Sequence, residues 1–155
     1  MPFFSFKRIG PICTGHRQWR SDSHCQLVHG YGRHVEIEFA CHELDDRGWV
    51  FGFGNLKDVE QWLKDQWDHR VLIAHDDPEL VSLTKADRLN LISINVCPES
   101  YGPGIEQSAH WVFDHVTEWV NNITDGRVWV DRVRVYEHEK NFAEYVREEK
   151  PAMYR

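Results

Sequence analysis

A thiol, an imidazole and a phenol stand close together in one short stretch of the chain, at Cys25, His29 and Tyr31. A second imidazole, that of His16, stands upstream. A reactive cysteine needs a partly exposed, electropositive setting, and basic residues flank Cys25 on both sides. We therefore interpret Cys25 as a candidate proton-transfer group. An inert core thiol is the alternative that a cysteine four residues before a histidine leaves open.

His16 and His29 flank this cysteine in a segment that we expect to be loop and strand edge, which suits zinc ligands. A catalytic zinc site takes three protein ligands and keeps one position open. Tyr31 stands in the third position, because strand alternation places it on the same side as His29. Tyrosine is an uncommon zinc ligand, since its reference pKa of about 10 requires the metal to displace a proton. Two histidines that only form hydrogen bonds are the competing interpretation.

Asp68 and His69 follow directly after a predicted helix, where side chains can leave the helix and face a cleft. A carboxylate that holds an imidazole tunes a general acid or base. Because the two residues are adjacent in sequence, we expect each side chain to face a different partner. An ordinary helix end is the alternative.

Glu106 and Glu137 stand far apart in sequence. If both point into one pocket, they suit a flat heterocycle with adjacent N–H and amino donors, bound by charge-assisted hydrogen bonds. Taken singly, Glu106 could complement a helix N-terminus and Glu137 could be the polar end of a strand. Three basic residues are candidates for holding a phosphate, namely Arg17, Arg20 and Arg70.

The composition excludes several classes of protein. In 155 residues, 18 basic against 25 acidic side chains give a net charge of -7, and no basic run interleaved with aromatics marks a nucleic-acid surface. No apolar run approaches the roughly 20 residues that span a bilayer. The four cysteines contain no C-x-x-C pair, which favours reduced thiols. We expect a soluble, cytoplasmic protein, one domain over residues 1–155, with no nucleic-acid or membrane partner.

Hydrophobic periodicity divides the chain into short elements. Alternation predicts strands over residues 3–9, 33–39, 129–137 and 142–146, and a short apolar run predicts another over 89–96. Spacings of three and four predict helices over 56–67, after an N-cap at Asn55, and over 105–120. Residues 10–25 and 75–87 read as a site-bearing loop and an exposed connection. The order indicates an α+β fold, with two helices on one face of an antiparallel sheet and a charged tail from about residue 146.

Several segments, in order, resemble motifs of the 6-pyruvoyl-tetrahydropterin synthase and 6-carboxy-tetrahydropterin synthase family. Gly15-His16 resembles its first zinc histidine, and Cys25 to Tyr31 resembles its C-x-x-x-H-G-H segment. Four further segments each resemble a family motif. Gly48–Lys57 is similar to G-x-V-x-D-F-x-x-L-K, and Trp67–Leu72 is similar to L-D-H-x-x-L. Pro103–Gln107 is similar to P-T-x-E-N, and Val135–Glu137 is similar to V-x-E. The resemblance covers about Phe3 to Tyr145 and implies the tunnelling fold, a four-stranded antiparallel sheet with two helices.

The resemblance also implies roles for these residues. Cys25 would be the thiolate that moves a proton on the substrate side chain, with Asp68 and His69 as the partner acid/base pair. Glu106 and Glu137 would anchor the pterin ring. A zinc ion held by His16 and His29 would polarise side-chain oxygens of 7,8-dihydroneopterin triphosphate. Family members assemble as hexamers of two stacked trimers, so a neighbouring chain could contribute some of these groups.

The three-residue gap between Cys25 and His29 resembles the bacterial queuosine-pathway enzymes, which favours 6-carboxy-5,6,7,8-tetrahydropterin synthase, the lyase that releases acetaldehyde and triphosphate. Three residues depart from the family pattern: Tyr31 replaces the third zinc histidine, Gly52 an aspartate and Gly104 a threonine. The alternatives are a zinc-free pterin-binding homologue, 6-pyruvoyl-tetrahydropterin synthase, or an enzyme that cleaves the side chain of dihydroneopterin itself.

Overall fold

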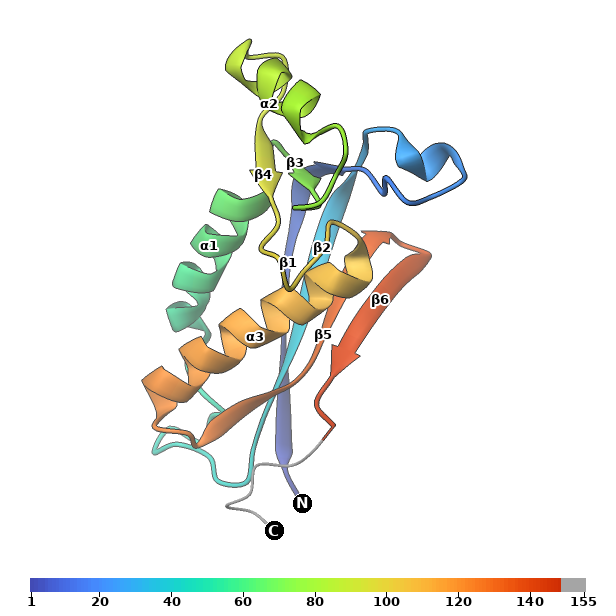
Figure 1. Ribbon diagram of the computed structural model, residues 1–155. Coiled ribbons are helices and arrows are strands. Elements are labelled where there is room, and N and C mark those ends of the chain that lie inside the picture. Colours follow the sequence, from blue (N-terminus) through green and yellow to red (C-terminus); the bar gives the residue numbers. More distant parts are fainter. Residues whose placement is uncertain (149–155) are drawn as a thin grey trace.

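A computed structural model describes residues 1–148, which form a six-stranded sheet in the order β4-β3-β1-β2-β5-β6 (Figure 1). Three long strands pair antiparallel at its centre: β1 (Phe3–His16), β2 (His29–Cys41) and β5 (Val128–His138). The strand β6 (Asn141–Val146) extends that order at one edge. At the other edge, β3 (Arg70–Ile73) and β4 (Ile94–Val96) join in parallel. The predicted α+β class is confirmed, and the four antiparallel strands are present as β1, β2, β5 and β6, but β3 and β4 extend the sheet to six strands.

The course of α1 (Lys57–Trp67) explains why β3 runs parallel to β1. Near its start, Glu60 pairs with Lys7 at 3.2 Å, and just after its end the His69 N–H donates to the Cys13 carbonyl at 2.7 Å. The helix therefore runs alongside β1, and β3, which follows it, pairs with the C-terminal end of β1 in the same direction. Parallel neighbours need a crossover of this kind, which a run of tight turns cannot supply.

β1 extends well beyond the predicted strand, into the first seven residues of the segment predicted as a loop. The register against β2 shifts between Ile9 and Ile12, which accommodates Gly10 and Pro11 as a bulge. Gly10 has a φ of 121°, and a Cβ there would lie 2.6 Å from the Arg33 carbonyl oxygen. A glycine-proline step looks like a strand end in sequence, but here it redirects the strand and lets it run on to His16.

α1 and α3 (Ile105–Thr124) cover one face of the sheet, as the sequence predicts (Figure 1). Their buried stripes pack on the inward residues of β2 and β5 in one core, which includes Ile37, Phe39, Leu63, Val112 and Val133. The predicted N-cap at Asn55 is wrong. A 3-10 turn over Phe53–Leu56 precedes α1, and the capping residue Leu56 offers no side-chain hydrogen bond.

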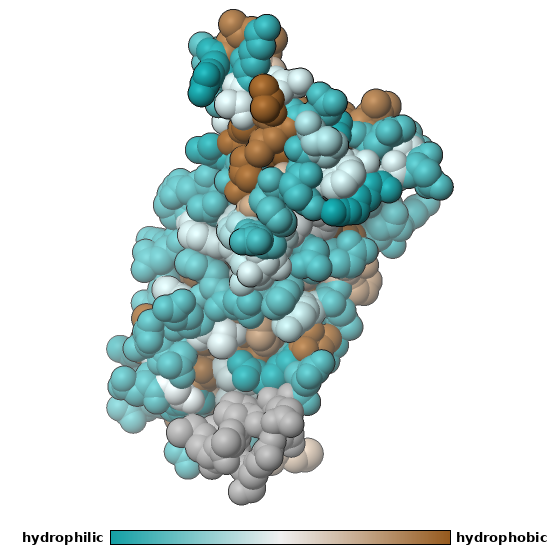
Figure 2. All heavy atoms as spheres, in the orientation of Figure 1, coloured by the Kyte–Doolittle hydropathy of each residue, from teal (hydrophilic) through white to brown (hydrophobic). Residues whose placement is uncertain are grey.

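A helix that the sequence did not predict, α2 (Leu80–Arg88), occupies the segment expected to be an exposed connection. None of its residues is buried, and its sequence carries only the short apolar stripe of Leu80, Leu83 and Ala86. The strand expected over 89–96 shortens to β4, because Leu89 and Leu91 belong to the turn that follows α2 and are exposed. Apolar side chains gather on the surface over this part of the molecule (Figure 2).

The chain closes the sheet with the β5–β6 hairpin, which confirms the last two predicted strands. Most of the predicted charged tail lies outside the described residues. Within residues 1–148, no helix has the length and apolar character needed to cross a bilayer.

Candidate functional site

The candidate site lies where β1 ends and β2 begins, on the face that the helices cover. His29, Tyr31 and Arg33 alternate along β2 on the same side as the buried Val35. The antiparallel register sets His16 directly opposite His29, and their ring centroids lie 4.4 Å apart. The prediction that Tyr31 shares the side of His29 is confirmed, since these two rings are 5.6 Å apart.

One cavity of about 480 Å³ gathers most of the candidate residues. Five of them line it, and they come from β1, the loop after it, β2, α3 and β5; they are His16, Cys25, His29, Glu106 and Glu137. The remaining lining includes Gln18 and three residues of the β5–β6 turn and β6, Lys140, Asn141 and Phe142. Side chains that are 121 positions apart in sequence thus share one hollow, which only the folded sheet brings about.

His16 is neutral, and a backbone hydrogen bond orients the ring of His29. His16 is 2% exposed, and burial, reinforced by Arg33 and His29, lowers its pKa to about 3. Its Nδ1 has no hydrogen-bond partner among the described residues. His29 donates from Nδ1 to the Leu27 carbonyl at 2.7 Å, because a carbonyl oxygen can only accept, and this fixes the tautomer with a free lone pair on Nε2.

His16 and His29 are suited to bind a metal ion, whereas the third ligand that such a site needs is less clearly supplied. Backbone support of one ring nitrogen is usual for a histidine that binds a metal through the other, and the orphaned His16 Nδ1 is a buried polar atom that a ligand would satisfy. Residues 1–148 hold no group of three His, Cys, Asp or Glu side chains placed for one ion. Tyr31 is the remaining donor, and burial, with Glu137 and Cys25, raises its pKa, which favours the neutral phenol.

Cys25 sits in a short 3-10 turn, His24–Gln26, that projects it over the cavity. The turn is held by the Ser23 hydroxyl, which accepts from the Cys25 N–H at 3.3 Å, and by the Cys25 carbonyl, which accepts from the Gln18 N–H at 2.9 Å. The thiol is partly exposed, unlike those of Cys41 and Cys97, which are buried. This matches the accessible setting that a reactive thiol needs.

Arg33 lies buried beside the site, and the search for site residues in the sequence missed it. The side chain is fully buried and donates to the Ser108 hydroxyl at 3.0 Å and to the Pro103 carbonyl at 2.8 Å. These bonds connect β2 to the start of α3, and the first turn of α3 carries Glu106. Burial lowers the pKa of Arg33 to about 10, although Glu137 acts to raise it. A basic residue at an inward position of an alternating strand is the signal that would have identified it.

Asp68 and His69 do not line this cavity. Both are exposed, with side-chain exposures of 43% and 81%, and His69 has a φ of 55°, uncommon for a residue other than glycine. His69 donates from Nδ1 to the Asp68 carboxylate at 3.0 Å. The expectation that adjacent side chains face different partners is therefore wrong, because the left-handed backbone at His69 turns the ring back toward Asp68. The carboxylate leaves Nε2 of His69 free as a base.

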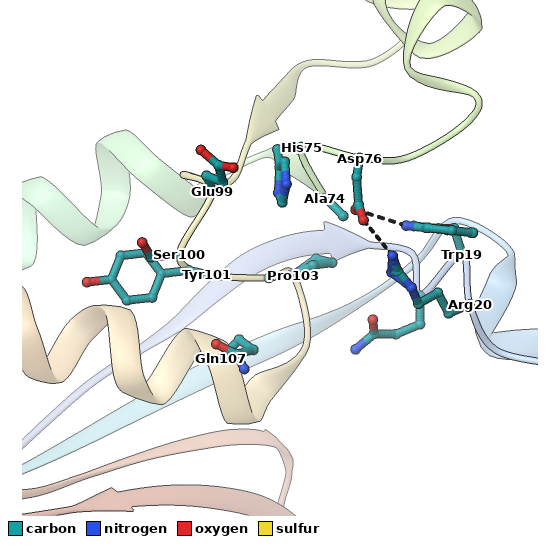
Figure 3. A pocket seen from close by; sticks show the side chains of 12 residues that line it. Trp19, Arg20, Ala74, His75, Asp76, Glu99, Ser100, Tyr101, Pro103 and Gln107 are labelled. Atoms are coloured by element: carbon teal, nitrogen blue, oxygen red, sulfur yellow. Dashed lines mark hydrogen bonds and ion pairs between the residues drawn. The ribbon is translucent and has the colours of Figure 1, made fainter.

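A second pocket of about 260 Å³ adjoins the first and shares Gln18 with it. It lies between the loop after β1, the segment after β3 and the turn that leads into α3 (Figure 3). On one side, Asp76 accepts from the Trp19 indole at 3.3 Å and from the Arg20 guanidinium at 2.6 Å. On the other side lie Glu99, Ser100 and Tyr101 (Figure 3). Nothing in the sequence pattern indicated this pocket.

Two of the three departures from the family pattern find places in the structure. A Cβ on Gly104 would collide with the side-chain nitrogen of Gln18, which fills the space where a larger residue would sit. Gly52 lines a separate hollow with Ser5, Trp49 and Phe53, away from the histidines and glutamates.

Comparisons with known proteins agree with this geometry. The sequence profile described as 6-pyruvoyl tetrahydropterin synthase matches residues 7–148. The chain is 36% identical over 68 residues to 6-carboxy-5,6,7,8-tetrahydropterin synthase of Rickettsia felis and 34% identical over 68 residues to that of Rickettsia conorii. Each match covers 43% of this chain and 49% of the relative, so the chain spans about half the length of the curated relatives it matches.

Solved structures show the same fold. An uncharacterised protein of Wolinella succinogenes superimposes with a TM-score of 0.84 at 22% identity, over 96% of this chain and 99% of that one. The 6-pyruvoyl tetrahydropterin synthase of Plasmodium vivax gives a TM-score of 0.64 at 15% identity, over 94% and 98% of the two chains. At these identities the likeness concerns the fold alone.

Proposed function

Because the chain belongs to the 6-pyruvoyl tetrahydropterin synthase family, we propose that it is a lyase that binds a dihydropterin and cleaves its side chain. The observation that carries the proposal is the single cavity lined by His16, Cys25, His29, Glu106 and Glu137. The first candidate reaction is that of 6-carboxy-5,6,7,8-tetrahydropterin synthase, because the relatives carry this name. In this candidate the substrate is the triphosphate, and the pathway is 7-deazaguanine (queuosine) biosynthesis. Cleavage of unphosphorylated dihydroneopterin and the 6-pyruvoyl reaction are the other candidates.

The glutamates bind the ring in this proposal. Glu106 and Glu137 face one cavity from different elements, so two carboxylates can accept the adjacent N–H donors of a pterin together. Glu106 lies in the first turn of α3, where the helix dipole favours an ionised carboxylate. Arg33 holds that turn on β2 and so keeps the carboxylate in place.

Proton transfer falls to Cys25 and to the pair of Asp68 and His69. The thiol of Cys25 lines the cavity and can move a proton on the substrate side chain. The Asp68–His69 pair carries a free Nε2 on the surface, outside that cavity. We propose that it completes the site of a neighbouring subunit in a hexamer of two stacked trimers, since an exposed acid/base pair needs a substrate brought to it.

His16 and His29 are the residues that would hold a zinc ion, with Tyr31 as the third donor. The neutral state of His16, its orphaned Nδ1 and the backbone bond that orients His29 support this assignment. Lewis-acid polarisation of the side-chain oxygens is the chemistry that zinc would supply there. The raised pKa of Tyr31 favours the second candidate function, a zinc-free homologue that binds pterin without catalysis.

Two measurements test the proposal. Purified protein, with and without added zinc, is incubated with 7,8-dihydroneopterin and with its triphosphate, and substrate loss and aldehyde release are followed. Turnover of either substrate supports the lyase, whereas binding of pterin without turnover of either supports the homologue without catalysis. Metal analysis of the wild type and of His16→Ala then decides the zinc assignment, because a bound zinc that needs His16 must be lost in the variant.

The ring-binding role is tested with conservative variants. Glu106→Gln and Glu137→Gln should each weaken pterin binding by about 10–100-fold, since a hydrogen bond to a charged group contributes roughly 1.5–3 kcal/mol. Glu118→Gln is the matched control, because Glu118 lies exposed on the same helix as Glu106 and lines neither pocket. If all three variants bind pterin as tightly as the wild type, the proposal that Glu106 and Glu137 bind the ring is refuted.

A further inference from the structure

We propose that Gln18 contacts the substrate ring next to Glu106 and selects a ring that carries a carbonyl group beside an N–H. In this role the side-chain amide of Gln18 donates a hydrogen bond to the carbonyl, while Glu106 accepts from the neighbouring N–H. The inference rests on the proposed function and adds to it a residue that determines specificity. Both residues belong to one chain, so the contact does not depend on groups that a neighbouring subunit supplies.

Gly104 leaves room for the side chain of Gln18. The backbone of Gly104 has a φ of -69° and a ψ of 160°, an extended conformation that residues with a side chain adopt readily, so the backbone does not require glycine. A Cβ at this position would collide with the side-chain nitrogen of Gln18. The glycine, which stands where the family pattern has a threonine, and the glutamine are therefore a matched pair. The amide occupies the space of the missing side chain.

Gln18 and Glu106 are neighbours at this point. The Glu106 Oε2 lies 3.4 Å from the place that a Gly104 Cβ would take, and the amide nitrogen of Gln18 lies closer to it. Both side chains line the cavity of about 480 Å³. A carboxylate only accepts hydrogen bonds, so the N–H end of the amide is the end favoured beside it. The wall of the cavity therefore presents a donor directly beside an acceptor.

The backbone around Gln18 is held in place, whereas its side chain is not engaged. The Gln18 N–H donates to the Cys25 carbonyl, and the Gln18 carbonyl accepts from the Ser21 N–H, each at 2.9 Å. The preceding residue, Arg17, is held by two hydrogen bonds to Asp77, at 2.7 and 3.1 Å. In the part of the chain that the structure describes, the side-chain amide of Gln18 forms no hydrogen bond. A half-buried amide that is positioned but unpaired is available to a ligand.

A donor beside an acceptor matches one edge of a pterin ring. On that edge a carbonyl oxygen, which accepts, stands next to an N–H and an amino group, which donate. Glu106 accepts from these donors, and Gln18 donates to the carbonyl. An analogue with an amino group in place of the carbonyl sets a donor against the amide N–H of Gln18, and neither then has a partner. A site built to bind a polar group rejects an analogue that lacks it, because the site's own polar groups are left unpaired.

Fluorescence titrations of the full chain at pH 7 test this role with two ligands that share one tail. They are 6-hydroxymethylpterin and 2,4-diamino-6-hydroxymethylpteridine, in which an amino group replaces the ring carbonyl. The exchange also alters the ring N–H from which Glu106 accepts, so the readout is the change that a variant makes to each affinity. Gln18→Leu keeps the size of the side chain and removes the amide. This variant should bind the pterin about tenfold more weakly and the diamino compound no more weakly than the wild type does.

Two further variants separate a contact with the ring from support of the fold. Gln18→Ala combined with Gly104→Thr places a hydroxyl near the present position of the amide nitrogen, and a hydroxyl also donates. This double variant should bind the pterin within about threefold of the wild-type affinity, whereas Gly104→Thr alone, which sets the threonine against Gln18, should bind it about tenfold more weakly. Gln26→Leu is the matched control, because Gln26 is exposed in the same loop and lines neither pocket. It should leave both affinities unchanged.

Three results would overturn the inference while leaving the pterin site intact. The first is a wild-type affinity for the pterin in Gln18→Leu. The second is an equal loss of affinity for both ligands in that variant, which a merely structural role would give. The third is a double variant that binds the pterin no better than Gln18→Leu does. If the wild type does not bind the pterin at all, the proposed function is overturned, and this inference with it.

Discussion

The pairing of Arg17 with Asp77 is predicted to hold in place the loop that carries Cys25. The pair joins the residue after β1 to the turn before α2, and the side-chain exposures are 18% and 0%. Asp77 also accepts from the Glu79 N–H at 2.8 Å. Arg17→Met would leave this carboxylate buried without its cation.

The expected loss of stability follows from that burial. Removing one partner of a buried ion pair costs roughly 3–5 kcal/mol, and the partial exposure of Arg17 places this pair at the lower end, at about 3 kcal/mol. For a chain of this size, about 2–4 °C of melting temperature corresponds to each kcal/mol, so the melting temperature should fall by roughly 6–12 °C. Urea unfolding followed by tryptophan fluorescence measures the change directly.

Arg20→Met is the matched control. Arg20 lies in the same loop and pairs with an aspartate at 2.6 Å, but the two side chains are 64% and 39% exposed. An exposed pair contributes about 0–1 kcal/mol. The double variant Arg17→Met, Asp77→Leu should recover part of the loss, because no charge is then left buried alone. If the two single variants lose equal stability, or Arg20→Met loses more, the reasoning from burial is refuted.

Two further predictions concern single side chains. In native protein at pH 8, a thiol reagent should label Cys25 and spare Cys97. Cys97 is 1% exposed, and burial raises its pKa to about 11, so its thiolate is scarce. Labelling of Cys97 as fast as that of Cys25 would contradict the burial. The ring of His115 stacks on that of Trp62, with 3.7 Å between the ring centroids, and burial lowers the pKa of His115. The unfolded state therefore binds a proton more readily than the folded state does. The stability that this histidine provides at neutral pH is lost as the pH falls below about 6.5. His115→Phe should therefore flatten the fall in unfolding free energy between pH 7.5 and 5.5, measured by urea titration, whereas His24→Gln, at an exposed position, should leave that slope unchanged.

Much of the fold could be predicted because its long elements carry a strong periodic signal. The alternation of Val35, Ile37 and Phe39 identified β2, and the stripe of Val112, Val116 and Val120 identified α3, since each pattern buries one face of its element. The elements that were missed carry a weaker signal or a shorter one. α2 buries no residue, and β3 is too short for alternation to distinguish it from a loop, while β4 was predicted but over too long a range.

Residue types and short spacings were enough to name the chemical groups of the site and their family, because both can be read from the linear order of the chain. Glu106 and Glu137 could be named, but only the fold showed that they share a cavity with His16 and Cys25. The tertiary structure alone decided which groups are free to act. Burial leaves His16 neutral, the register places it against His29, and Arg17 is bound to Asp77. Desolvation and pairing depend on what packs around a side chain, and that is decided by residues distant in sequence.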